Sequence, residues 1–181
     1  MTDKAPQIDP AGCRELLALA RRTLESYLQD GQPFPYLASN PALKIHSGAF
    51  VSLHAGSHLR GCIGQTIAEQ ELYRTVQQCA ISAAVDDYRF APVTREELRE
   101  LVIEISVLTP MQRLQNFEEI EVGRHGLYIV RGIKRGLLLP QVATEYGWDR
   151  ESFLVQSCRK AGLRDDAWGQ PGTAVYTVEA Q

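Results

Sequence analysis

The sequence lacks the features that mark several large classes of protein. No apolar run is long enough to cross a bilayer, and charged residues interrupt the first thirty positions, where a signal peptide needs an uninterrupted apolar stretch. The 181 residues carry a formal net charge of −3, with 19 Lys and Arg against 22 Asp and Glu. There is thus no basic excess of the kind that binds duplex nucleic acid. We expect a cytoplasmic protein without a membrane partner.

Cysteine is also scarce, and its spacing excludes the common uses of clustered thiols. The four cysteines form no C-x-x-C pair, no triplet for an iron–sulfur cluster and no zinc-finger spacing with histidine. They are Cys13, Cys62, Cys79 and Cys158. His54 and His58 flank a predicted turn and could approach each other across it, but no third metal ligand is evident. We expect reduced thiols, no metal and no cofactor.

The residues that are present suit a folded core. Hydrophobic residues make up 44% of the chain, enough for one domain or two closely packed subdomains. Periodicity and capping signals predict helices over about 10–30, 69–85, 141–146 and 149–161, and strands over about 48–54, 58–65, 101–108, 126–130, 135–139 and 174–178. Most of these strands are joined as hairpins. The pattern predicts an α+β fold with a mostly antiparallel sheet flanked by helices.

Two segments resemble each other closely enough to suggest an internal duplication. Each starts at a glycine, turns, returns through an Arg-Gly pair, reaches a glutamine and leads into a helix. The Arg-Gly pairs are Arg60-Gly61 and Arg135-Gly136, and the glutamines are Gln65 and Gln141. We therefore predict a tail over residues 1–9 and a single domain over 10–178, with repeats at about 48–85 and 126–162. If the duplication is real, the two Arg-Gly pairs frame one cleft.

The most unusual segment is Leu59-Arg60-Gly61-Cys62-Ile63-Gly64, which places two glycines inside a predicted strand. Glycine weakens a strand, and it usually marks a bulge or a close approach by another backbone or a ligand. Side chains alternate across a strand, so Arg60, Cys62 and Gly64 are expected on one face and the apolar residues on the core face. The segment therefore has the character of a functional site.

Cys62 has two interpretations at this stage. A guanidinium that bends from Arg60 toward the sulfur would favour a reactive thiolate. In the other interpretation, Cys62 is a small packed hydrophobic residue, as most free cysteines are, and Arg60 pairs with a carboxylate. Sequence alone leaves both open.

A set of motifs is spread along nearly the whole chain. The motifs are Leu59-Arg60-Gly61-Cys62-Ile63-Gly64, Asp87-Tyr88-Arg89-Phe90 with Pro92-Val93, Glu104-Ile105-Ser106-Val107-Leu108-Thr109-Pro110, Gly123-Arg124-His125-Gly126-Leu127, Gly136-Leu137-Leu138-Leu139-Pro140-Gln141 and Gly147-Trp148. In this order they resemble the AMMECR domain family. The resemblance covers residues 10–178 and implies duplicated hairpin-plus-helix units that form a barrel-like sheet. Tyr88 departs from the family, which usually has proline there, so the local turn is expected to be looser.

The resemblance also implies a functional context. The family is the A component of the AmmeMemoRadiSam system, encoded with or fused to a Memo-like protein related to extradiol dioxygenases and a radical S-adenosylmethionine protein. It brings no settled reaction. Because this chain has no cysteine triplet for an iron–sulfur cluster, any radical chemistry belongs to a partner.

The first functional hypothesis is a substrate-binding or catalytic component that acts with those partners, including in the modification of RNA or another biomolecule. The catalytic candidates are Cys62, Glu104 and His125, and the substrate-binding candidates are Arg60, Gly61, Gly64, Arg89, Arg124, Arg135 and Gln141. Each candidate also has a structural interpretation. Arg89 with Asp87 is then a turn pair, Glu104 a solvent-facing strand residue and His125 a loop residue.

Two other hypotheses do not need a reactive thiol. In one, the protein is a non-catalytic adaptor whose surface docks the Memo-like or radical partner. In the other, it binds RNA directly through the cations around the second hairpin, although a solvated basic face explains them equally well. These cations and the histidine beside them are Arg124, His125, Arg131, Lys134 and Arg135.

Overall fold

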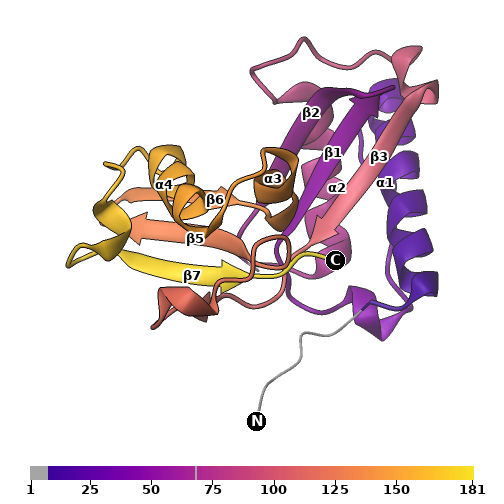
Figure 1. Cartoon of the computed structure of the whole chain (residues 1–181). Coiled ribbons are helices and arrows are strands. Elements are labelled where there is room, and N and C mark those ends of the chain that lie inside the picture. The colour runs from indigo at the N-terminus through magenta and orange to yellow at the C-terminus, as the bar shows by residue number, and fades with distance from the viewer. Residues whose placement is uncertain (1–7, 68) are drawn as a thin grey trace. The chain divides into compact units, whose positions relative to one another are not determined.

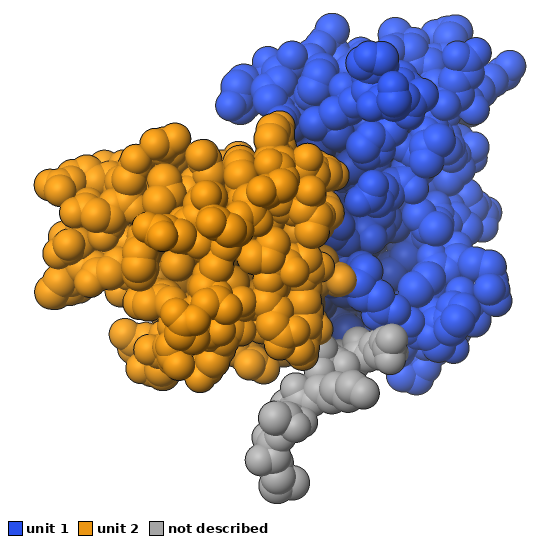
Figure 2. Space-filling model, in the orientation of Figure 1, with its two compact units in different colours: residues 1–107, 181 blue, residues 108–180 orange. Residues whose placement is uncertain are grey.

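The computed structural model describes residues 8–67 and 69–181 of the chain (Figure 1). The chain forms two compact units, which Figure 2 shows in different colours. Unit 1 comprises residues 1–107 together with Gln181, and unit 2 comprises residues 108–180. Each unit folds around its own hydrophobic core. Each of the two predicted repeats, 48–85 and 126–162, lies inside one unit.

Unit 1 is a three-stranded antiparallel sheet with helices packed against one face (Figure 1). Its strands are β1 (Ala49–Ala55), β2 (His58–Gln65) and β3 (Leu101–Val107), in the order β2-β1-β3. Its helices are α1 (Pro10–Asp30) and α2 (Leu72–Val85), with short 3-10 turns η1 (Pro41–Leu43) and η2 (Glu97–Arg99). Helix α2 contacts β1 and β2, and α1 contacts α2 and β3.

Helix α1 shows how local signals fix an element of unit 1. The side chain of Asp9 accepts a hydrogen bond from the backbone N–H of Gly12, and Pro10 occupies the first helical position, where its missing N–H costs nothing. Gly31 ends the helix in the left-handed conformation with φ 68°, which glycine adopts without strain. The helix then buries an apolar stripe that includes Leu16 and Leu24.

The close packing of α2 on the sheet explains the first glycine of the unusual segment. A Cβ added to Gly61 would overlap the carbonyl oxygen of Ala83 near the end of α2, so only glycine fits there. The side of α2 that faces the sheet is made largely of small residues, including Cys79, Ala80 and Ala83. The backbone that approaches Gly61 is therefore that of α2.

Unit 2 is a four-stranded antiparallel sheet with its own pair of helices. Its strands are β4 (Gln112–Arg113), β5 (Gly126–Arg131), β6 (Lys134–Leu138) and β7 (Ala174–Val178), in the order β4-β7-β5-β6. Its helices are α3 (Pro140–Glu145) and α4 (Arg150–Lys160), with 3-10 turns η3 (Phe117–Glu119) and η4 (Ala167–Gly169). Helix α4 packs on β5 and β6 around the buried side chain of Phe153.

The two units share a connection pattern. In each, a hairpin is followed by helix and then by a strand that pairs with the first strand of the hairpin, giving β2-β1-β3 in one unit and β6-β5-β7 in the other. Gly136 of β6 meets the end of α4 as Gly61 of β2 meets the end of α2, because a Cβ on Gly136 would lie 2.6 Å from the backbone nitrogen of Ala161. The duplication itself stays a prediction.

The structure confirms the predicted mixed fold with antiparallel sheets and flanking helices. The barrel-like arrangement is not confirmed, because neither sheet closes on itself among the residues described. Within residues 8–67 and 69–181, no helix has both the length and the apolar character needed to cross a membrane.

Candidate functional site

The candidate site lies on the face of the unit 1 sheet opposite its helices, which we call the polar face. Along β1, Ala49, Val51 and Leu53 are fully buried toward the helices, whereas the alternate residues are only half-buried. These alternate residues are Phe50, Ser52 and His54. Ser52 pairs with Cys62 of β2 on one side and with Glu104 of β3 on the other. Cys62, Ser52 and Glu104 therefore form a row across the three strands.

Cys62 is held by contacts to both its side chain and its backbone. The hydroxyl of Ser52 donates a hydrogen bond of 3.1 Å to the Cys62 sulfur. On the other side, the Cys62 N–H donates to the Asp87 carboxylate at 2.9 Å, and the Cys62 carbonyl accepts from the Arg89 guanidinium at 3.3 Å. Two motifs that lie 25 residues apart in sequence thus converge on this one residue.

Asp87 and Arg89 form a bidentate pair whose side chains bind the backbone of β2, as a neighbouring strand would. The Arg89 guanidinium donates to both Asp87 oxygens, at 2.9 and 2.7 Å, while the Asp87 side chain is almost fully buried. These hydrogen bonds hold the pKa of the Asp87 carboxyl well below its usual range and raise the pKa of Arg89. Because β2 is at the edge of its sheet, the pair satisfies backbone groups that are otherwise open to pairing with another chain.

Arg60 occupies a β-bulge and points away from the row. Leu53 pairs with Gly61 and His54 pairs with Leu59, so Arg60 is the extra residue. The bulge also places Leu59 opposite His54, on the polar face and not with Gly61 as we expected. The Arg60 guanidinium binds Glu97 at 3.0 and 3.2 Å, and this contact lowers the pKa of Glu97.

The same guanidinium also ties down the segment that leads to η2. It donates to the carbonyl oxygens of Ala91 and Pro92, at 2.7 and 3.3 Å. Glu97 in turn accepts from the Thr94 N–H, and the Thr94 hydroxyl accepts from the Glu97 N–H, so these two residues form a capping box. These contacts account for Arg60 without a ligand, and its role in substrate binding stays a prediction.

Gly64 is also explained by a neighbour in the protein. It pairs with Phe50 of β1, and a Cβ added to Gly64 would overlap the Phe50 ring. The Phe50 ring therefore lies over β2 in the space that a side chain at position 64 would occupy. A ligand at Gly61 or Gly64 stays a prediction, since α2 fills the space at one and Phe50 fills it at the other.

Glu104 is joined on the polar face by His54. The Nε2 atom of His54 lies 3.6 Å from the Glu104 carboxylate, and the Glu104 side chain is half exposed. This Nε2 atom is buried and has no hydrogen-bond partner among the described residues. A buried nitrogen without a partner is uncommon and is found at reactive sites or where water or a ligand binds. The row thus contains a thiol, a hydroxyl and a carboxylate, and the His54 imidazole lies beside it.

The other thiols offer a contrast within the same chain. Burial raises the pKa of Cys79 to about 11 and also raises the pKa of Cys158, which keeps both in the uncharged form at neutral pH. Cys13 and Cys62 are the two partly exposed thiols. No group of three or more His, Cys, Asp and Glu side chains in the described part of the chain could hold a metal ion.

The remaining candidates lie in unit 2. The Nδ1 atom of His125 accepts from the Glu121 N–H at 3.1 Å, and its Nε2 atom is 4.0 Å from Glu179. Arg124 pairs with both Glu121 and Glu179, each at 2.9 Å. Arg135 is exposed on β6, and the Gln141 carbonyl accepts from the Thr144 hydroxyl. Arg124 and His125 are thus engaged with acidic residues near the start of β5.

The predicted basic cluster divides into two groups. Arg124 and His125 precede β5, whereas Arg131, Lys134 and Arg135 surround the turn at its other end. Since a strand advances about 3.3 Å per residue, the groups are separated by roughly the length of this strand. Lys134 also donates to the carbonyl of Gly162. The five residues therefore form two separate groups, and RNA binding by either group stays a prediction.

Comparison with known proteins identifies the family to which this fold and its motifs belong. The sequence model of the AMMECR1 family matches residues 17–181. The chain belongs to the AMMECR1 family. A protein of Thermococcus onnurineus is 45% identical over 177 residues, covering 92% of this chain and 86% of that protein. A protein of Thermofilum pendens is 42% identical over 183 residues, with the same coverage.

A solved structure in the AMMECR1 family has the same fold. The crystal structure of uncharacterized protein PH0010 from Pyrococcus horikoshii matches with a TM-score of 0.87 and 43% sequence identity. The match covers 92% of this chain and 87% of that chain. The AMMECR1 assignment thus rests on the whole fold as well as on the motifs.

Several residues around Cys62 in this AMMECR1-family chain are not among the site residues predicted from the sequence. Ser52 and His54 could have been found from the alternation of β1, which places them on the polar face with Phe50. Asp87 belongs to a quoted motif, but neither it nor Glu97 carries a local signal that places it beside β2, because they act through contacts to residues 25 and 37 positions away.

Proposed function

We propose that the protein is a catalytic or substrate-binding component that works in the cytoplasm through Cys62 on the polar face. Its proposed partners are a Memo-like protein and a radical S-adenosylmethionine protein, and its proposed substrate is an RNA or another biomolecule. The observation that supports this proposal is the convergence on Cys62 of Ser52, Asp87 and Arg89, which hold both its sulfur and its backbone. Such support is the usual condition for a positioned reactive group.

The other residues of the row provide what a thiol needs for chemistry. The Ser52 hydroxyl fixes the direction of the Cys62 sulfur, and Glu104 with His54 supplies two groups that can accept a proton. Glu104 lies across Ser52 from Cys62 in the strand register. In this proposal, substrate lies over the row and contacts the Cys62 sulfur.

A second candidate function is the adaptor, and a specific observation favours it. Arg60 and Arg89 are both bound to carboxylates, and the space at Gly64 is filled by Phe50, so the motif is explained without any small ligand. Tyr88 between Asp87 and Arg89 is 95% exposed, which is unusual for an aromatic side chain next to a fixed pair. In this alternative, the loop around Tyr88 docks the Memo-like or radical partner.

Protection from alkylation would distinguish the two functions. We would measure the rate at which iodoacetamide modifies Cys62, by peptide mass spectrometry, with small-molecule, RNA and protein fractions of the host added in turn. Cys13, the other partly exposed thiol, is the internal control in the same tube. A substrate-binding site predicts that the small-molecule or RNA fraction slows modification of Cys62 several-fold and leaves Cys13 unchanged.

Other outcomes have equally clear meanings. Protection by the protein fraction alone would favour the adaptor. A Cys62 thiol that reacts more slowly than Cys13 under all conditions would make it a packed residue and contradict the catalytic role. Purification of wild type and Cys62→Ser from the host completes the test, because an adaptor keeps its partners in the variant.

A further inference from the structure

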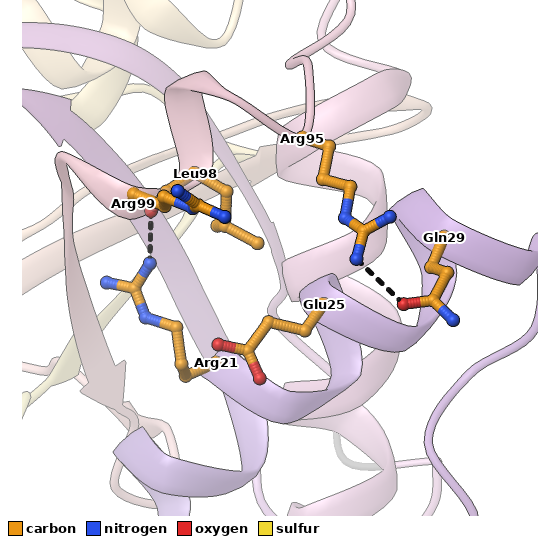
Figure 3. Close-up of a pocket in the computed structure, with 6 residues that line it drawn as sticks. All are labelled: Arg21, Glu25, Gln29, Arg95, Leu98 and Arg99. Atoms are coloured by element: carbon orange, nitrogen blue, oxygen red, sulfur yellow. Dashed lines mark hydrogen bonds between the residues drawn. The ribbon is translucent and has the colours of Figure 1, made fainter.

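A second candidate site lies in unit 1 beside α1, apart from the row around Cys62. A hollow of about 610 Å³ lies between α1 and the segment that contains η2, within the size of small-molecule sites, roughly 300–1,000 Å³ (Figure 3). Its lining is almost entirely polar: Arg21, Glu25, Gln29, Arg95, Leu98 and Arg99. Most ligand sites are lined mainly by apolar side chains. The polar lining of this hollow instead suits a charged ligand.

The sequence places these side chains together in a simple way. Arg21, Glu25 and Gln29 are four residues apart and so lie on one face of α1. Arg95 and Arg99 are also four residues apart, in the turns around η2. In Figure 3 the side chains from the two segments face each other across the hollow.

Among the described residues, none of the three arginines forms an ion pair with a carboxylate, although Glu25 lines the same hollow. Arg21 donates to the backbone carbonyls of Leu98 and Leu101, and Arg95 donates to the Gln29 amide at 3.0 Å (Figure 3). Arg99 has neither a hydrogen bond nor an ion pair among the residues that the structure describes. By contrast, arginines elsewhere in the chain, such as Arg60, Arg89 and Arg159, are paired with carboxylates. Three guanidinium groups without a carboxylate partner among the described residues therefore line one hollow.

We infer that this hollow binds a small anion with more than one negative charge, such as a phosphorylated or polycarboxylate metabolite. Arg21, fixed by two backbone carbonyls, is a preorganised donor, and Arg95 and Arg99 supply further donors with the fork geometry that matches phosphate and carboxylate. Glu25 accepts from a hydroxyl group of the ligand. An adjoining hollow brings Glu96 and Glu100 to the rim, which disfavours a long polyanion such as RNA.

Calorimetric titration of the full chain tests this inference. Pyrophosphate is titrated first and citrate second, at fixed ionic strength, into wild type, Arg99→Gln and Arg14→Gln. We expect saturable binding of one of these anions to wild type and a Kd about ten-fold higher in Arg99→Gln, which loses one charge-assisted contact. Arg14→Gln is the matched control, because Arg14 is an exposed cation of the same helix that does not line the hollow.

Each result has a defined meaning. Binding of pyrophosphate alone assigns the hollow to phosphorylated ligands, and binding of citrate alone assigns it to polycarboxylates. The inference is overturned if neither anion binds saturably, or if Arg14→Gln weakens binding as much as Arg99→Gln. Thermal unfolding of each variant without ligand verifies that the fold is intact, which is expected because Arg99 has no partner to lose.

Discussion

At the scale of single residues, Asp87 is the residue on which the support of Cys62 depends most directly. We expect Asp87→Asn to lower the free energy of unfolding by about 2 kcal/mol, because it removes a buried charge from the Arg89 fork and from the Cys62 N–H. Urea denaturation measures the change. Asp86→Asn is the matched control, since Asp86 is the exposed neighbour and its loss should alter stability by less than about 0.5 kcal/mol.

The same residue predicts a pH dependence. Since the pKa of Asp87 is lower in the folded chain than in the unfolded chain, its contribution to stability is complete above the unfolded value, about 3.9, and is lost as the pH falls toward the folded value. The difference in unfolding free energy between wild type and Asp87→Asn should therefore be constant near neutral pH and shrink below about pH 4. A difference that does not change with acidification would show that the charge is not what stabilises the fold.

Gly64 and Phe50 are predicted to be coupled. Gly64→Ala should cost about 2 kcal/mol in wild type, because the added Cβ overlaps the Phe50 ring. In a Phe50→Ala background the same change should cost less than about 0.5 kcal/mol, because the space is then free. A double-mutant cycle in urea measures the coupling. Equal costs in both backgrounds would mean that glycine is required for another reason, such as a ligand.

The residues of the candidate site were predictable only where the signal was local. Alternation along β2 placed Cys62 and Gly64 on one face, and alternation along β3 placed Glu104 there too. The direction of Arg60 was not predictable, because the bulge is a property of the β1–β2 pairing and because its partner Glu97 is 37 residues away. Sequence patterns describe single strands, whereas this site is built from contacts between segments.

At the scale of elements, the packing of each helix on its hairpin depends on one glycine. Gly61→Ala should destabilise unit 1 by about 3 kcal/mol, because the Cβ meets a backbone carbonyl of α2 that cannot rotate away. Gly136→Ala should act in the same way on unit 2 through α4. Gly169→Ala is the matched control, since nothing lies within 4 Å of its added Cβ. The midpoint of urea unfolding of each variant measures the change in stability. Equal midpoints for all three variants would show that the close approach of each helix backbone to its glycine is not what requires glycine.

The boundaries of an element were predictable where capping residues mark its ends. Asp9, Pro10 and Gly31 mark the two ends of α1, and the structure places the helix between them. Strand β4 was not predicted, because its two residues are defined by pairing with β7, and no periodicity exists in so short a segment. The position of such a short strand is thus determined by long-range pairing and not by the local sequence pattern.

At the scale of the whole molecule, composition and hairpin order predicted a mixed antiparallel fold, and the structure confirms it. The division at Val107 was not visible in the sequence, because no run of glycine, proline or charge marks it. It emerges from which residues pack together. One core collects residues from α1, α2 and the first sheet, and the other collects residues from α4 and the second sheet.

The two cores predict how the molecule unfolds. Both tryptophans, Trp148 and Trp168, pack against the core of unit 2, whereas the long helix α1 belongs to unit 1. Tryptophan fluorescence therefore reports on unit 2, and far-ultraviolet circular dichroism reports on both. We expect Gly136→Ala to shift the fluorescence transition to lower urea and to split the dichroism transition into two steps. Gly61→Ala should shift dichroism and leave fluorescence in place. If both probes move together in both variants, the units unfold as one cooperative structure despite their separate cores.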